Sequence, residues 1–219
     1  MVALPSGRRA GTILPVRKLW IALPVVLLVG NSFLSRPLET PAPRPIDWTA
    51  EPAQVATDRQ PFPFETGKGT VTLHPRARFE VSAVVAGTER YWLDGGSFLC
   101  PLDLALIWGD LPEEPYKDEV TYGQMSRYYF WRTESSELDL GYIQSHSSNM
   151  HLIPATENLR RALFAIDEGD SVRLSGLLVD ADREDGFTWK SSTSRQDEGP
   201  GACELVWVEE AQVEGKVYR

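Results

Sequence analysis

Residues 1–34 constrain this chain most, because they join a basic flank to an uncharged apolar stretch. Residues 1–18 contain four basic side chains and no acidic one, and residues 19–34 contain no charged side chain. Such a pattern directs a chain to a membrane and keeps its basic end in the cytoplasm. We therefore expect a single-pass protein of the cell membrane whose C-terminal domain lies outside the cytoplasm.

The apolar stretch is short for a membrane span. A spanning helix needs about 20 residues, whereas the core of a signal peptide has about 7 to 15. Residues 13–34 reach spanning length if Arg17 and Lys18 extend their charged ends to the interface. We expect a transmembrane anchor within residues 1–35 that contacts the cytoplasmic (inner) membrane through residues 13–34. A cleaved signal peptide is the alternative.

Residues 36–64 differ in composition from the segments on either side. Seven prolines fall within this range, and few aliphatic side chains accompany them. Such a segment cannot bury a core of its own and favours an extended backbone. The sequence therefore predicts a proline-rich linker over residues 36–64 that holds the following domain away from the bilayer.

Residues 65–219 are long enough to enclose one hydrophobic core without extensive cross-linking. They contain 15 Lys and Arg and 27 Asp and Glu, which gives a formal net charge of −12. An acidic surface repels polyphosphate backbones, so we expect no nucleic-acid partner. We also expect no cofactor and no metal, because His146 and His151 are spaced for neither a helical nor a strand-borne pair of ligands.

Alternating or aromatic-rich apolar patterns predict strands in several parts of this domain. They are found in residues 79–85, 127–133, 171–180, 186–194 and 203–213. Alternation with a period of two places every second side chain on one face of a sheet. Residues 171–180 and 186–194 are joined by a short polar segment that is typical of a hairpin.

Two segments fit short helices. Pro101 suits the first position of a helix and Gly109 the position after its end, so the sequence predicts a helix over residues 102–108. Residues 157–166 carry apolar side chains at helical spacing and follow Thr156, a residue that commonly caps a helix. We expect both helices to pack on the sheet.

These elements together predict a mainly β domain with two short helices. Gly176 lies in the middle of a predicted strand, where glycine permits the strong coiling that a small closed sheet requires. We expect a small curved β-barrel similar to the oligonucleotide/oligosaccharide-binding (OB) fold, preceded by the N-terminal transmembrane helix. An open α+β sheet is the alternative.

The densest polar segment lies between the last two predicted strands, and a second one precedes the predicted helix at residues 157–166. Together they supply nine candidate groove residues: His146, Asn149, His151, Trp189, Ser191, Ser192, Arg195, Asp197 and Glu204. An aromatic-edged polar groove suits a peptide or a glycan. In the alternative interpretation, Arg195 pairs with Asp197 or Glu204 and only orders the loop. We assign no catalytic residue, because no complete serine-hydrolase motif is present.

Cys100 and Cys203 are the two cysteines of the chain. In an oxidising compartment they can pair, and the loop closed by the bridge is worth up to about 4 to 5 kcal/mol. Pairing requires Cα atoms within about 7 Å of each other. The expected position of Cys100 at the start of a helix argues against such pairing, so two free thiols are the alternative.

Several strings in the domain resemble an uncharacterised family of bacterial single-span membrane proteins with an extracytoplasmic domain. They are PLDLALIWG at 101–109, RYY at 127–129, HSSNMHLIPA at 146–155, GDSVRLSGLLV at 169–179 and WKSSTSRQDEGPGACE at 189–204. The resemblance covers most of residues 67–210. It implies membership of this family, but it implies no substrate. The family pattern has Ser at the position of Cys100, which counts against a disulfide shared by its members.

These observations favour a non-catalytic, membrane-tethered domain that binds an envelope protein or a glycan. The alternative is an envelope hydrolase that uses the polar cluster from Ser191 to Glu204 together with His151. A third hypothesis is an accessory subunit of a membrane complex, in which the anchor itself makes the contacts.

Overall fold

The computed structural model describes residues 36–42, 44–194, 199 and 201–219. The expected anchor over residues 1–35 lies outside this part of the chain, as do Arg195 and Asp197 of the candidate groove. The chain divides into two units, residues 1–36 and residues 37–219, and the description below concerns the second unit. Among the described residues, no helix has the length and apolar character needed to cross a membrane.

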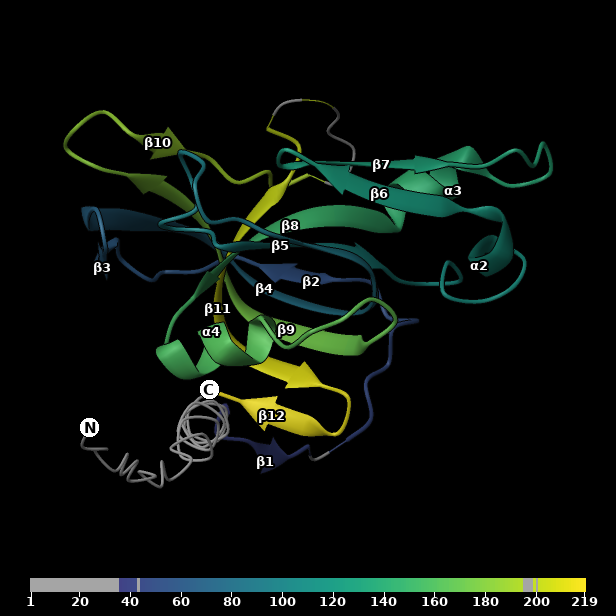
Figure 1. The fold of residues 1–219 in the computed structure, drawn as a ribbon, viewed down its shortest axis with the longest axis horizontal. Helices are drawn as coiled ribbons and strands as arrows, with labels where there is room; N and C mark the ends of the chain where they lie inside the picture. The colour runs from purple at the N-terminus through teal and green to yellow at the C-terminus, as the bar shows by residue number, and fades with distance from the viewer. Residues whose placement is uncertain (1–35, 43, 195–198, 200) are drawn as a thin grey trace, which may run out of the picture. The chain divides into compact units, whose positions relative to one another are not determined.

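The second unit is mainly β, as the sequence predicts (Figure 1). Ten strands form one sheet: β1 (Thr40–Pro41), β2 (Ala53–Val55), β3 (Phe62–Thr66), β4 (Gly69–Arg90), β5 (Leu102–Ile107), β8 (Ser147–Pro154), β9 (Ser171–Asp182), β10 (Thr188–Trp189), β11 (Glu204–Val213) and β12 (Lys216–Tyr218). A separate hairpin consists of β6 (Thr121–Met125) and β7 (Tyr128–Arg132). The described helices are α2 (Tyr116–Glu119), α3 (Leu140–Ser145) and α4 (Glu157–Leu163).

Five strands carry most of the pairing. β4 pairs with β5 and β9, β5 also pairs with β8, and β11 pairs with both β8 and β9. The β8–β11 pair is parallel, and the other four pairs are antiparallel. The register of β4 against β9 shifts between Pro75 and Ala77, and that of β9 against β11 shifts between Val208 and Glu210. Such irregularities bend a strand and increase its twist.

Gly176 allows β9 and β11 to approach closely. A Cβ atom on this residue would lie 1.9 Å from the carbonyl oxygen of Trp207, a distance that no side chain tolerates. The residue also pairs with Phe79 of β4, so the backbones of three strands converge here. A glycine inside a strand commonly marks such a close approach.

The two faces of these strands pack into different cores. On β5 the side chains of Leu102, Leu104 and Leu106 enter the larger core, which α4 covers with Leu159 and Leu163. The smaller core on the opposite face includes Cys100 and Trp207 among its buried residues, and Phe62 and Phe64 of β3 pack against it. Figure 1 shows α4 and the β6–β7 hairpin on opposite sides of β5 and β8.

The segment at residues 102–108, expected as a helix, is strand β5. Every residue of this strand is buried, so the sequence does not show the alternation between exposed and buried side chains that is typical of a strand at the surface. A short continuous apolar run does not by itself distinguish a buried strand from a buried helix. The prediction of a helix there is wrong, and Cys100 therefore caps no helix.

The helix expected over residues 157–166 is confirmed as α4 and is shorter at its C-terminus. The Thr156 hydroxyl accepts a hydrogen bond of 3.1 Å from the Leu159 N–H, as an N-cap residue does. Residues 147–154, in the polar segment that precedes this helix, form strand β8. Of the strand expected over residues 186–194, only Thr188 and Trp189 are assigned as strand, in β10.

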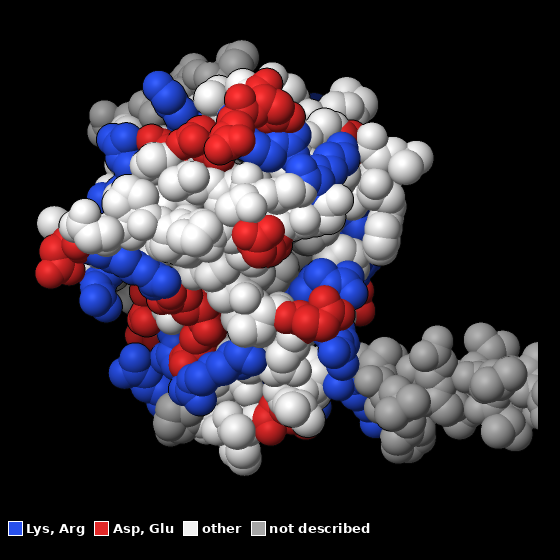
Figure 2. All heavy atoms as spheres, turned by 90° about the vertical axis from the view of Figure 1, so that its left-hand side faces the viewer, with Lys and Arg blue, Asp and Glu red and all other residues white. Residues whose placement is uncertain are grey.

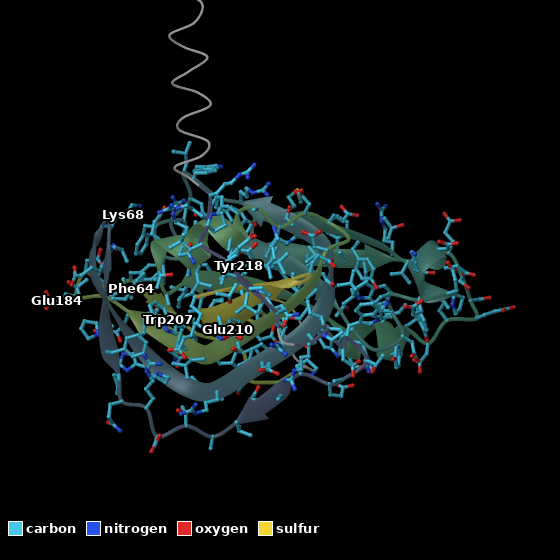
Figure 3. The ribbon with its side chains drawn as sticks, turned by 90° about the horizontal axis from the view of Figure 1, so that it is seen from below. Phe64, Lys68, Glu184, Trp207, Glu210 and Tyr218 are labelled. Carbon is cyan, nitrogen blue, oxygen red and sulfur yellow. The ribbon has the colours of Figure 1, made fainter. Side chains whose placement is uncertain are left out.

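The proline-rich segment expected as a linker carries three of the strands. β1 pairs with β12, and both β2 and β3 pair with β4. The rings of Phe62 and Phe64 meet the ring of Trp207 edge to face, with centroid distances of 5.3 Å and 4.9 Å. Figure 3 shows Phe64 beside Trp207. Phe-Pro-Phe places both aromatic rings on one face, so the smaller core orders a segment that cannot form a core alone.

Charges of both signs are interspersed on the face at the β3 and β10 end of the unit (Figure 2). Arg183, for example, donates to both carboxylate oxygens of Asp185, at 2.8 Å and 2.6 Å. This face therefore carries no extended patch of a single sign, although the domain as a whole is acidic.

Candidate functional site

The candidate groove residues that the structure describes do not all meet in one site. His146 follows α3, stacks on the ring of Tyr142 at 3.7 Å, and its Nε2 lies 2.9 Å from Glu51 Oε1. This histidine therefore takes part in a contact between α3 and the segment before β2. It does not join the other candidate residues.

Ser191 and Ser192 form a local hydrogen-bonded turn. The Ser191 hydroxyl accepts from the Leu205 N–H at 3.0 Å and donates to the Ser192 carbonyl at 2.7 Å. The Ser192 hydroxyl donates to the Ser194 carbonyl at 2.8 Å. These bonds tie the segment after β10 to the start of β11, so Ser191 has a structural role.

His151 and Asn149 lie on the face of β8 that points away from the larger core. Asp103 occupies the same face of β5 and pairs directly with His151 in the strand register. The Nδ1 of His151 lies 2.9 Å from Oδ2 of Asp103, and the His151 ring lies 4.8 Å from the ring of Trp189. Asp103 is fully buried and His151 is nearly so, which makes this a buried polar cluster.

Arg127 supplies the positive charge of this cluster. Its Nη1 lies 2.8 Å from Asp103 Oδ1, while Nε and Nη2 donate to the two oxygens of Asp94 at 2.6 Å and 2.9 Å. The guanidinium carbon lies 3.4 Å from the ring centre of Tyr91 and 5.4 Å from that of Trp189. One arginine thus joins two carboxylates and lies between two aromatic rings.

The network and its burial shift the pKa values of Asp94 and Cys100 in opposite directions. The bidentate hydrogen bonds from Arg127 lower the pKa of Asp94 below its ordinary value. Burial raises the pKa of the Cys100 thiol well above its ordinary value, and the charge of Asp103 adds to the effect. The Asp94 carboxylate therefore stays charged and the Cys100 thiol stays protonated at neutral pH.

The β6–β7 turn places Arg127 in this cluster. Ser126 and Arg127 both have positive φ angles, 54° and 75°, as a two-residue type I′ hairpin turn requires. The Arg127 N–H donates to the Tyr91 hydroxyl at 2.9 Å, which fixes the turn against the loop after β4. Arg127 and Asp103 were not predicted from the sequence as site residues. The signal that was present is an aspartate within an otherwise apolar run.

A hollow of about 420 Å³ lies next to this cluster, beside β7. Its lining combines four consecutive aromatic residues with polar groups and small residues: Tyr128, Tyr129, Phe130, Trp131, Gln144, Ser147, Ser148, Asn149, Ser194, Gly199, Ala202, Cys203 and Glu204. We call it the β7 groove. Asn149 and Glu204 are the predicted residues that line it, whereas the aromatic wall was expected only as a strand.

The polar floor of the β7 groove is connected by hydrogen bonds. The Ser148 hydroxyl donates to Glu204, and the Tyr129 hydroxyl lies 3.0 Å from that of Ser147. The Asn149 side-chain oxygen accepts from Gln124 Nε2 at 2.7 Å. Burial raises the pKa of Tyr129, so its hydroxyl stays protonated and is able to donate.

Both cysteines are free thiols in the structure. Cys203 lines the β7 groove, and its Sγ lies 3.9 Å from Asn149 Nδ2. Burial raises the pKa of Cys203 to about 11, so the thiolate is scarce at neutral pH. Because the thiolate is the reactive form, this environment does not activate Cys203 as a nucleophile. Within the described ranges, no group of three or more His, Cys, Asp or Glu residues is arranged to hold a metal ion.

Comparison with known proteins identifies no relative of this chain. No protein-family model, no curated protein and no solved structure matches the chain.

Proposed function

We propose that this protein is a membrane-tethered, non-catalytic binding module of the cell envelope, and that the β7 groove is its ligand site. One observation carries the proposal: a hollow walled by Tyr128, Tyr129, Phe130 and Trp131 has a floor of hydroxyl, amide and carboxylate groups. Aromatic walls supply apolar contact, and a few fixed polar groups supply orientation, which is the usual composition of a ligand site.

The arrangement of the strands supports the same location. We propose that β4, β5, β8, β9 and β11 form a small OB-like barrel, because each of the five pairs with two others of the set. The helix α4 lies between the third and fourth of these strands in the chain, and the third pairs in parallel with the fifth. OB folds bind ligands on the face of their second and third strands. In this chain those strands are β5 and β8, which carry Asp103 and Asn149.

The environment of the candidate catalytic groups favours binding over hydrolysis. Among the described residues, neither His146 nor His151 is hydrogen-bonded to Ser191 or Cys203. His146 lies against Glu51, and His151 lies against Asp103. Ser191 forms a structural turn, and the raised pKa of Cys203 keeps its thiol protonated. These groups are used to hold the fold together around the groove.

Residues 1–35 supply the proposed tether. Their basic flank and apolar stretch support a cytoplasmic N-terminus and an extracytoplasmic domain. The groove would then face the compartment that contains envelope proteins and glycans.

Photo-crosslinking from the groove tests the binding role. Phe130 lies on the groove wall and is 45% exposed, so a photoreactive phenylalanine analogue is tolerated there. Val55 of β2 is 58% exposed and does not line the groove, which makes it the matched control. We expect a specific adduct with an envelope component from position 130 and none from position 55. An adduct from both positions, or from neither, would contradict the proposal.

A further inference from the structure

Within the described residues, one edge of β7 has no partner strand. This strand pairs with β6 and with no other strand of the described chain. Met125 and Tyr128 flank the two-residue turn, so they form a hydrogen-bonded pair, in which each backbone N–H donates to the carbonyl of the other residue. Along the hairpin, hydrogen-bonded pairs then alternate with pairs that are not hydrogen-bonded. The backbone groups of Tyr128, Phe130 and Arg132 therefore point to β6, while those of Tyr129 and Trp131 point to the free edge.

This free edge borders the β7 groove. Successive side chains of a strand alternate between its two faces, so a single face contributes every second residue. The groove is lined instead by four consecutive residues, 128–131. Its wall is therefore the backbone edge of the strand, together with parts of the side chains on both faces.

β7 lacks two of the features that usually protect an edge strand, lysine and proline. Exposed edge strands are commonly blocked by lysine, proline, a bulge or a covering loop, because their unpaired N–H and C=O groups pair readily with another strand. β7 has the sequence YYFWR, with no lysine and no proline and with strong β propensity. Tyr128 and Phe130 are 51% and 45% exposed, so apolar surface accompanies the free backbone groups.

We infer that the ligand of the β7 groove is an extended peptide segment that adds to the free edge of β7 as a third strand. The inference rests on the proposed binding role of the groove and names the class of ligand and the atoms that hold it. The N–H and C=O groups of Tyr129 and Trp131 alternate with the spacing of a strand, which a peptide backbone matches and a glycan does not.

The charges around the groove indicate a basic peptide. A second hollow shares Trp131 with the groove and is lined by three exposed carboxylates, Asp118, Glu119 and Glu134, against one cation, Arg132, so its charged side chains are net negative. Lysine or arginine side chains of an added strand would lie near these carboxylates. Pairing with the β7 edge of a second copy is opposed by the net charge of −12 over residues 65–219 of each copy.

Defined peptides test this inference on the full-length chain in neutral detergent micelles. The probes are acetylated and amidated octapeptides of alternating Val and Lys, with alternating Val and Glu as the charge control. We expect the Lys peptide to bind about tenfold or more tightly than the Glu peptide. Equal affinity of the two would remove the charge part of the inference.

Backbone N-methylation of the Lys peptide tests strand addition itself and requires no protein variant. Methyl groups on one alternate set of residues would remove the N–H groups that face β7 and weaken binding about tenfold or more. Methyl groups on the other alternate set would face solvent and change the affinity by less than about twofold. Equal loss from both sets would overturn the inference.

Protein variants locate the site. Phe130→Ala should weaken the Lys peptide about fivefold, because it removes exposed groove surface. Met125→Ala is the matched control, since Met125 is 66% exposed on β6 and does not line the groove. Trp131→Pro removes a groove-facing N–H and should abolish binding, whereas Trp131→Phe keeps that N–H. Circular dichroism and the melting temperature check that each variant folds.

The outcomes separate this inference from the binding role on which it rests. An adduct from position 130 without peptide binding would mean that the groove has a ligand of another class. Concentration-dependent dimerisation in analytical ultracentrifugation, lost in Trp131→Pro, would mean that the edge of β7 pairs with a second copy. The absence of adduct, peptide binding and dimer would contradict both proposals.

Discussion

The carboxylate of Asp103 and the guanidinium of Arg127 form an ion pair of 2.8 Å between the centre of the sheet and the tip of the β6–β7 hairpin. The Asp103 side chain is 0% exposed and that of Arg127 is 15% exposed. This pair therefore holds the tip of the hairpin against the sheet, and with it the aromatic wall of the β7 groove.

Arg127→Met should lower the free energy of unfolding by about 3 to 5 kcal/mol, because it leaves the buried Asp103 carboxylate without its main counter-charge. Urea denaturation measures the change. Arg127→Met combined with Asp103→Leu removes both charges, so this double variant should recover part of the loss. If the double variant is no more stable than Arg127→Met alone, the unpaired Asp103 carboxylate is not the main reason for the loss.

Gly176→Ala should destabilise the domain by about 3 kcal/mol or more, because the added Cβ has no room against the backbone of β11. The added atom would lie 1.9 Å from the Trp207 carbonyl oxygen. Gly215→Ala is the control, since nothing lies within 4 Å of the Cβ built there. Thermal unfolding monitored by circular dichroism should show a large shift for the first variant and a small one for the second.

Asp94 should contribute to acid sensitivity. Its pKa is lowered in the folded state from an ordinary value of 3.8, chiefly by hydrogen bonds from Arg127. A lowered folded-state pKa gives stability that is fully present above the unfolded value and is lost as the pH falls through the folded value. The stability difference between the native protein and Asp94→Asn should therefore be constant near neutral pH and shrink below pH 3.8.

Denaturant titrations at several pH values measure this dependence. Glu184→Gln, in the exposed turn between β9 and β10, is the matched control and should leave the pH profile unchanged. A difference for Asp94→Asn that persists unchanged to pH 2 would show that its carboxylate does not drive the effect.

Cys203 should react slowly with iodoacetamide at pH 8 in the folded protein, and its rate should rise toward pH 11, because burial raises its pKa to about 11. Mass spectrometry after alkylation follows the reaction, and Cys203→Ser assigns it. After unfolding without reductant, protein from the native compartment should show two alkylated thiols, Cys100 and Cys203. Two unmodified cysteines would instead support the disulfide that the sequence left open.

The N-terminus should stay in the cytoplasm and residues after Leu34 should lie outside it, because of the basic flank at residues 1–18. Alkaline phosphatase fused after Arg219 should be active in a bacterial host. A fluorescent reporter that matures only in the cytoplasm should stay dark in the same position. A bright reporter with an inactive phosphatase would overturn the proposed compartment and the envelope partner with it.

Local sequence patterns were sufficient to predict the elements that depend mainly on residues close together in the chain. Thr156 and the helical spacing after it predicted α4, because capping and amphipathic periodicity act within a few residues. The alternation in residues 171–180 predicted β9 for the same reason. Gly176 was identified from its position in a strand, and the structure supplies the cause, which is the nearby backbone of β11.

Only the tertiary structure decided the rest, because those outcomes depend on contacts between distant residues. Residues 102–107 are a strand because both of their faces are buried, and no periodicity within the segment reveals this. Phe62 and Phe64 belong to the domain because Trp207, far along the chain, packs against them. Asn149 and Glu204 were chosen from the sequence as groove residues, but the β7 wall and the Asp103–Arg127 pair exist only once β5, β7, β8 and β11 are assembled.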